Sequence, residues 1–123
     1  MITKVSDANS GDVLEMWGTG SPLRQHLYVD DMCKIIPQLL EKHDTNVPLI
    51  VAPDENVSIA NICSIMNKIS GKNLKFIFNG KLDGQYRKDG SNKKLHNLIG
   101  DFNYTTLKEG LKITYEWYNV NRK

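Results

Sequence analysis

The most informative part of the chain is residues 15–31, which read Glu-Met-Trp-Gly-Thr-Gly-Ser-Pro-Leu-Arg-Gln-His-Leu-Tyr-Val-Asp-Asp. Its first residues close an alternating apolar run, which predicts a strand over 12–17. Gly18 and Gly20 predict a sharp turn, because a residue without Cβ adopts positive φ at little cost. We therefore expect a strand that ends in a tight turn immediately after Trp17.

A second extended segment is predicted directly after this turn. Pro22 favours extended backbone in the residue before it, and the alternation over 23–28 is typical of a half-buried strand. The turn would bring the indole of Trp17 near the guanidinium of Arg24. An aromatic plate and a planar cation fit a nucleoside diphosphate, one for the base and the other for the phosphate. The ordinary alternatives are a core tryptophan and a surface arginine.

These motifs resemble one family. The pattern Trp17-Gly-Thr-Gly-x-Pro-x-Arg-Gln25, followed by Tyr-Val-Asp-Asp-Met at the start of a helix, is similar to the C-terminal part of GDP-L-fucose synthases. These are extended short-chain dehydrogenase/reductases that act on GDP-sugars. Residues 83–95, which begin Asp-Gly-Gln-Tyr-Arg-Lys, and the C-terminal residues 101–118 resemble later segments of the same family. The resemblance covers nearly the whole chain and is most specific at 83–88.

The resemblance implies four substrate-binding residues. Trp17 would stack on the guanine or line the sugar pocket, and Arg24 would clamp the diphosphate. Asp83 would accept hydrogen bonds from ribose or sugar hydroxyls, since an ionised carboxylate is a pure acceptor. Lys88 would place a point charge on the phosphate oxygens. Without the resemblance, Asp83 reads as part of an Asp-Gly turn and Lys88 as one lysine of a solvated basic loop.

Three patterns that could suggest further chemistry do not support it. Gly18-Thr-Gly20 lacks the third glycine and the following helix of a dinucleotide-binding turn. Tyr104 and Lys108 have the Tyr-x-x-x-Lys spacing of reductases, but they straddle a predicted helix start at Thr106. The three histidines have no spacing typical of a metal site. We therefore expect no catalytic, cofactor-binding or metal-binding residues in this chain. The family resemblance implies that NADP(H) binds to a separate N-terminal Rossmann domain.

Composition limits the classes of partner. The chain has 123 residues, a net charge of +2, 40% hydrophobic and 24% charged residues. This is ordinary for a globular domain, and nearly neutral charge does not favour nucleic acid or an anionic membrane. Cys33 and Cys63 are predicted to be buried thiols on helices, with a disulfide or a reactive thiol as the alternative. A cytoplasmic location is expected.

Hydrophobic spacing predicts the remaining elements. The N-terminal residues 1–8 resemble the tail of a helix. Helices are predicted from Asp30, as N-cap, to about residue 43 with a kink at Pro37, over 58–71 with Ser58 as N-cap, over 92–100, and after an N-cap at Thr106. Strands are predicted over 49–51 and 74–78. Residues 79–92 are polar and rich in glycine, so they are expected to form a functional loop.

We expect residues 1–123 to form one small α/β domain of three to four helices with short mixed strands. The function implied is binding of GDP-4-keto-6-deoxy-D-mannose within a larger, NADPH-dependent epimerase/reductase that is a homodimer. The chain would be a truncated piece of that enzyme. The alternatives are the substrate domain of another sugar-nucleotide reductase or epimerase, and a non-enzymatic nucleotide-binding or adaptor module.

Overall fold

The computed structural model describes residues 1–122, which form short strands and five helices. In chain order the elements are α1 (Ile2–Asp7), β1 (Val13–Met16), β2 (Leu23–Arg24), α2 (Val29–Lys42), β3 (Val57–Ser58), α3 (Ile59–Ser70), β4 (Lys75–Phe78), β5 (Arg87–Lys88), α4 (Lys93–Ile99) and α5 (Leu107–Asn121). The predicted α/β class is confirmed. The helix count exceeds the expected three to four because residues 2–7 form a helix of their own.

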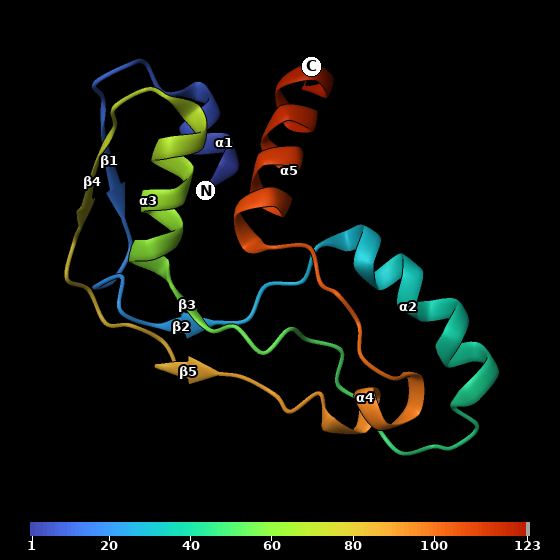
Figure 1. Ribbon diagram of the computed structural model, residues 1–123. Coiled ribbons are helices and arrows are strands. Elements are labelled where there is room, and N and C mark those ends of the chain that lie inside the picture. The colour runs from blue at the N-terminus through green and yellow to red at the C-terminus, as the bar shows by residue number, and fades with distance from the viewer. Residues whose placement is uncertain (123) are drawn as a thin grey trace.

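The strands form two small sheets. β1 and β4 pair in parallel, with Val13 opposite Lys75 and Met16 opposite Phe78. β2 lies between β3, which is antiparallel to it, and β5, which is parallel to it. Figure 1 shows the β1–β4 pair beside α3 at one end of the molecule, with β2 and β3 below α3 and β5 beneath them. The predicted mixture of strand directions is therefore present.

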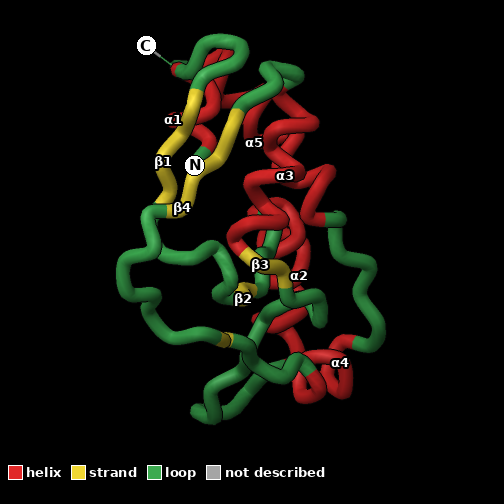
Figure 2. Tube along the Cα trace, turned by 90° about the vertical axis from the view of Figure 1, so that its left-hand side faces the viewer, coloured by secondary structure: helices red, strands yellow, loops and turns green. Residues whose placement is uncertain are grey.

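The hydrophobic core lies between α1, α3, α5 and the β1–β4 pair. Its buried residues are Val5, Val57, Ile62, Met66 and Leu74, and Phe76, Leu107, Leu111 and Tyr115 pack against them. α2 contacts α4 instead, and Figure 2 shows α4 at the opposite end of the molecule from β1 and β4. The contact between α2 and α4 therefore forms a second, smaller packing region away from this core.

Several local predictions are confirmed. Gly18 and Gly20 have φ of 78° and 79°, so the turn after β1 uses the backbone freedom that only glycine has at low cost. Ser58 caps α3, since its Oγ accepts the amide proton of Asn61 at 3.1 Å. Gly71 ends α3 in the left-handed conformation. Thr106 caps α5 by accepting from the backbone amide of Glu109.

Other local predictions are wrong. Residues 49–51 form no strand, although their apolar run suggested one; the neighbouring strand is β3, where Val57 pairs with Arg24. α2 begins at Val29 with Tyr28 as N-cap, so Asp30 lies in the first turn rather than at the cap. The extended segment after Pro22 has only two residues in a strand, and 25–28 leave the sheet. The prediction that this helix continues past Pro37 is, by contrast, confirmed, since α2 runs to Lys42.

The two cysteines are both free thiols in different settings. Cys63 is buried, and burial raises the pKa of its thiol. Cys33 is exposed, which contradicts the prediction of a second buried thiol.

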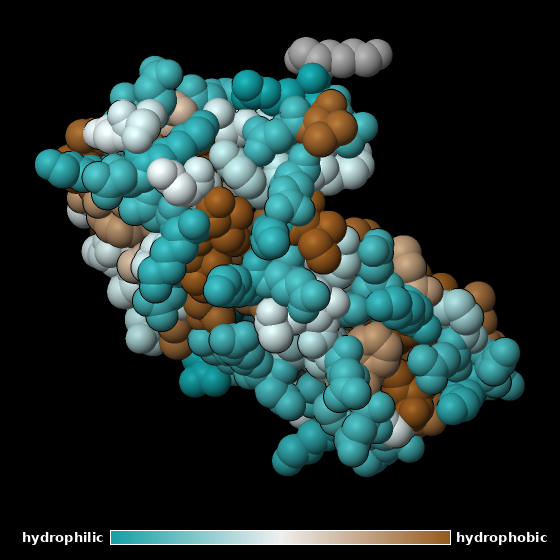
Figure 3. Space-filling view, turned by 45° about the horizontal axis from the view of Figure 1, so that its top comes forward, coloured by the Kyte–Doolittle hydropathy of each residue, from teal (hydrophilic) through white to brown (hydrophobic). Residues whose placement is uncertain are grey.

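Within residues 1–122 no helix combines the length and apolarity needed to cross a bilayer. Figure 3 shows brown hydrophobic patches that reach the surface between polar regions.

Candidate functional site

The loop after β4 is tied to the glycine turn after β1. The amide of Gly80 donates to the carbonyl of Gly18 at 3.0 Å, and the amide of Gly18 donates to Oδ1 of Asn79 at 3.0 Å. Parallel pairing of β1 and β4 brings these two strand ends to the same edge. The two segments that carry the predicted site residues therefore lie side by side.

Asp83 completes this connection. Its carboxylate accepts the backbone amide of Thr19 at 2.9 Å and the hydroxyl of Thr19 at 2.5 Å. Hydrogen bonds from the Thr19 hydroxyl and then the Thr19 amide hold the pKa of Asp83 below its usual value; burial opposes them, and the charge of Arg24 adds the smallest lowering effect. The sequence predicted a carboxylate that accepts from sugar hydroxyls. In the structure it holds the glycine turn, and a carboxylate has further acceptor positions beyond these two bonds.

Trp17 lies at the surface, with 66% of its area exposed. Its indole N–H donates to the carbonyl of Leu82 at 3.2 Å, and Nζ of Lys81 lies 4.7 Å from the ring centroid. These contacts orient the indole from the loop side, since the ring attracts a cation through its electron-rich face. The alternative of a core tryptophan does not apply, and an exposed, oriented indole is available to a flat ligand.

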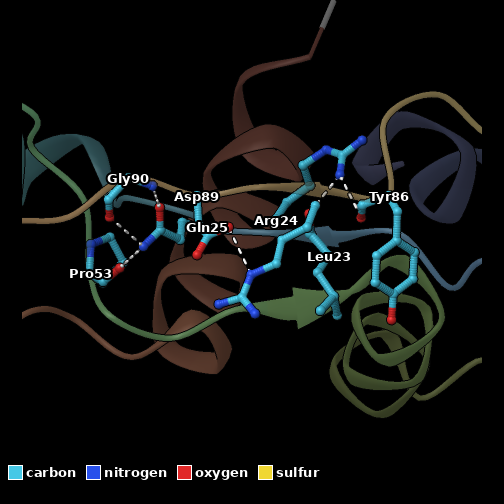
Figure 4. A network of polar contacts seen from close by, with 8 residues as sticks. Leu23, Arg24, Gln25, Pro53, Tyr86, Asp89 and Gly90 are labelled. Atoms are coloured by element: carbon cyan, nitrogen blue, oxygen red, sulfur yellow. Dashed lines mark hydrogen bonds and ion pairs between the residues drawn. The ribbon is translucent and has the colours of Figure 1, made fainter.

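Arg24 is half-buried and bonds to backbone carbonyls. Its Nη1 donates to Leu23 at 2.6 Å and to Tyr86 at 3.3 Å, and its Nη2 donates to Gln85 at 2.8 Å. Figure 4 shows Arg24 and Leu23 on opposite sides of β2, with the guanidinium over the carbonyl of Tyr86. Among residues 1–122, Arg24 forms no ion pair with a carboxylate. Its positive charge is therefore not neutralised by a salt bridge.

Lys88 is adjacent to Arg24. The two residues are register partners across the parallel β2–β5 pair, so their side chains leave the same face. Lys88 is exposed. Arg87 differs, because its Nε pairs with Asp89 at 2.7 Å. The structure thus brings together Arg24 and Lys88, and places Trp17 and Asp83 on the two segments that connect to them.

Two residues of this network were not predicted from the sequence. Thr19 binds Asp83, and the side chain of Gln25 bonds to the loops at Pro53 and Gly90. Neither has a spacing that would single it out, because its partners lie about 30 to 65 residues away. Their only signal was their place inside the family motif.

Two cavities lie beyond the predicted residues. They measure about 280 and 180 Å³ and meet at His26, Thr105, Thr106 and Leu107. None of the four predicted residues lines either cavity, so these two cavities lie outside the predicted site. Partial burial, followed by the charge of Arg24, lowers the pKa of His26.

The glycine turn does not have the strand-turn-helix arrangement of a dinucleotide-binding turn. The glycine turn at 18–20 leads into β2 instead of a helix, so no helix N-terminus receives a pyrophosphate there. Tyr104 precedes α5, and its hydroxyl is buried without a hydrogen-bond partner, whereas Lys108 is exposed on that helix. Within residues 1–122 no group of three potential metal ligands is present.

Comparison with known proteins identifies the family of this chain. A family model described as "NAD dependent epimerase/dehydratase family" matches residues 1–57. GDP-L-fucose synthase of Dictyostelium discoideum is 34% identical over 88% of this chain and 35% of its own length. This chain belongs to the extended short-chain dehydrogenase/reductase family. Its membership rests on 30% to 34% identity over 88% or more of this chain.

Further relatives within the extended short-chain dehydrogenase/reductases support the same assignment. A crystal structure of a GDP-L-fucose synthetase from Naegleria fowleri, also solved bound to NADP, superposes with a TM-score of 0.83 at 28% identity, over 89% of this chain and 34% of that one. A trifunctional UDP-glucose 4,6-dehydratase/epimerase/reductase of Arabidopsis thaliana is 33% identical over 93% of this chain and 17% of its own length. The chain spans about a third of the length of the GDP-L-fucose synthases it matches.

Proposed function

We propose that residues 1–123 form a single domain that binds the GDP-sugar of a GDP-L-fucose synthase-like enzyme, with GDP-4-keto-6-deoxy-D-mannose as substrate. The observation that carries this proposal is the pairing of Arg24 with Lys88 on adjacent strands. Similarity to GDP-L-fucose synthases over most of the chain supports the choice of a GDP-sugar.

Each site residue has a distinct role in this proposal. Arg24 directs its unused N–H donors at the diphosphate, and Lys88 adds a mobile positive charge from the next strand. Trp17 offers its open ring face to the guanine or the sugar. Asp83 uses its remaining acceptor positions on ribose or sugar hydroxyls while Thr19 holds it in place. Neutralising two phosphate charges beside a fixed aromatic surface binds and orients the nucleotide.

The parent enzyme would supply the chemistry. In this proposal an N-terminal Rossmann domain binds NADP(H) and carries the catalytic residues for 3,5-epimerisation and 4-ketoreduction. NADPH supplies a hydride when bound there. The described residues bind and orient the sugar nucleotide, and the parent is a cytoplasmic homodimer.

A second candidate is a domain for a different sugar nucleotide. The similarity to the Arabidopsis enzyme, whose name refers to UDP-sugars, favours this over a non-enzymatic adaptor. Arg24 and Lys88 would contact the diphosphate in either case, because that group is common to GDP- and UDP-sugars. The base is therefore the feature that separates the two candidates.

Calorimetric titration of the chain with GDP, UDP and ADP tests the proposal. We expect GDP to bind most tightly and GMP to bind more weakly than GDP, because it lacks the second phosphate. Tighter binding of UDP would favour the second candidate. An absence of binding to all four nucleotides would refute nucleotide recognition by this domain.

A further inference from the structure

The side chain of Gln25 continues the pairing of β2 with β5 beyond the end of the strands. The amide of Gly90 donates to Oε1 of Gln25 at 2.9 Å, and Nε2 of Gln25 donates to the carbonyl of Gly90 at 3.2 Å. A carboxamide carries the same donor and acceptor types as a peptide group. Gln25 therefore gives Gly90 the two bonds that a neighbouring strand would give it (Figure 4).

Gln25 also connects a third segment. Its Nε2 donates to the carbonyl of Pro53 at 2.8 Å. The amide thus uses both N–H donors and its oxygen on backbone groups of two loops that are far apart in sequence. These bonds are partly buried, which limits competition from water.

Gly90 is held from a second side by packing. A Cβ placed on Gly90 would lie 2.8 Å from both Cδ1 and Cγ2 of Ile50. The backbone at Gly90 therefore lies so close to the Ile50 side chain that a residue with a Cβ would collide with it. Four residues earlier, the carbonyl of Tyr86 accepts the amide of Leu23 at 2.8 Å. The segment from 86 to 90 is consequently fixed to β2 at both ends.

We propose that Gln25 is a positioning residue that holds Lys88 in register with Arg24, so that both cations face one diphosphate. This rests on the proposed function. Gln25 does not contact the ligand. Lys88 lies midway between the two anchor points, and β5 is only two residues long. Such a short strand has few ladder bonds of its own, so the side-chain amide supplies the end of the pairing that the backbone lacks.

Two variants and a matched control test the anchoring. Gln25→Leu removes all three bonds, and Gln25→Glu keeps the acceptor for Gly90 while placing a carboxylate against two carbonyls. Gln38→Leu is the control, because Nε2 of Gln38 bonds only to Lys34 of its own helix at 3.4 Å. By NMR, we expect amide hydrogen exchange of Gly90 to accelerate about tenfold or more in Gln25→Leu, as for loss of one or two ordinary hydrogen bonds. Unchanged exchange at Gly90 would overturn the proposal.

A double-mutant cycle with Lys88→Met tests positioning as distinct from general stability. We expect Lys88→Met to weaken GDP binding about fivefold in the wild-type and Gln38→Leu chains. In the Gln25→Leu chain the same change should have little further effect, because Lys88 is already displaced. Equal losses in all three backgrounds would overturn the positioning role. If the wild-type chain bound no GDP while Gly90 exchange still accelerated in Gln25→Leu, the proposed function would fail and the anchoring would stand.

Discussion

At the scale of single residues, Gly18 and Asp83 occupy one small space. Gly18 has φ of 78°, and a Cβ built there would collide with Oδ1 of Asp83. Gly18→Ala must therefore both strain the backbone and displace a carboxylate that holds Thr19. We expect it to lower the free energy of unfolding by about 2–4 kcal/mol, from left-handed strain plus lost hydrogen bonds. Urea denaturation measures this change.

Gly80→Ala is the matched control for that variant. Gly80 also has positive φ, 65°, but nothing lies within 4 Å of its would-be Cβ. It should show only the backbone strain, about 1–2 kcal/mol. Equal effects of the two substitutions would mean that Asp83 moves aside without loss.

The Asp83 contact also predicts a dependence on pH. Its pKa is lowered in the folded state, chiefly by the Thr19 hydroxyl and amide. The stability that it contributes is present above the unfolded pKa of about 3.9 and disappears as pH falls through the lower folded value. We expect Asp83→Asn to be less stable than wild type at pH 7, with the difference shrinking below about pH 4. A constant difference from pH 7 to pH 2 in urea denaturation would contradict this.

Arg24 and Lys88 should differ in their effect on nucleotide binding. Arg24→Ala should weaken GDP binding by about 2–3 kcal/mol and Lys88→Ala by about 1 kcal/mol, since a guanidinium makes paired bonds to charged groups. Arg24→Lys should restore little, because an ammonium lacks the planar fork. Arg87→Ala is the control, since Arg87 is paired with Asp89. Wild-type affinity in Arg24→Ala, measured by calorimetry, would move the site away from this turn.

Part of this site could be predicted from the sequence. Glycines that need positive φ, and the adjacency of Trp17 to the turn, follow from local chemistry. The register of Arg24 with Lys88 does not, because it depends on a pairing between residues more than 60 positions apart. The bonds of the Arg24 guanidinium to loop carbonyls could not be predicted either, because those carbonyls belong to residues that are distant in the sequence. The four site assignments themselves remain predictions.

At the scale of elements, α1 depends on a lysine from outside the helix. Nζ of Lys72 donates to the carbonyls of Val5, Ser6 and Ala8 at 2.9, 2.7 and 2.7 Å. A cation at the C-terminal carbonyls complements the helix dipole, and six residues are too few for an independent helix. Lys72→Met should therefore lower the free energy of unfolding by about 1–3 kcal/mol.

Amide exchange over residues 5–8, followed with urea denaturation, would measure the effect of Lys72→Met. Lys75→Met is the control, since Lys75 is an exposed lysine of the nearby β4. We expect it to leave both measurements nearly unchanged. Slow exchange over 5–8 in Lys72→Met would show that packing alone maintains α1.

Elements with a strong local signal were predicted well. Ser58 and Gly71 mark α3 at both ends, and the helix matches. The predicted strand over 49–51 is absent because an apolar run forms a strand only when it has a partner strand. Here β3 occupies the position beside β2. Asp30 is not the N-cap because α2 starts two residues earlier than predicted, with Tyr28 at the cap; in the first turn the Asp30 carboxylate still favours the helix N-terminus.

At the scale of the whole molecule, α5 carries an exposed apolar stripe. Ile113, Trp117 and Val120 are exposed, with Trp117 at 64%, and Ile113 and Trp117 line a groove of about 430 Å³ with Val29 of α2. Exposed apolar patches promote association. We expect the chain to self-associate at high concentration in analytical ultracentrifugation.

Trp117→Lys should shift that association toward the monomer. Leu40→Lys is the control, because Leu40 is 83% exposed but lies outside the groove. It should leave the association constant nearly unchanged. A wild-type chain that stays monomeric at the highest concentration tested would show that these exposed apolar side chains do not drive self-association.

The parallel pairing of β1 with β4 also has a consequence for synthesis on the ribosome. Val13 has no strand partner until Lys75 has been synthesised. At about 5–20 residues per second, the roughly 60 intervening residues take about 3–12 seconds to emerge. During that interval β1 is an unpaired strand bearing Leu14 and Met16, a condition that favours capture by a neighbouring nascent chain. This part of the nascent chain is therefore exposed to aggregation, and in need of a chaperone, until β4 is made.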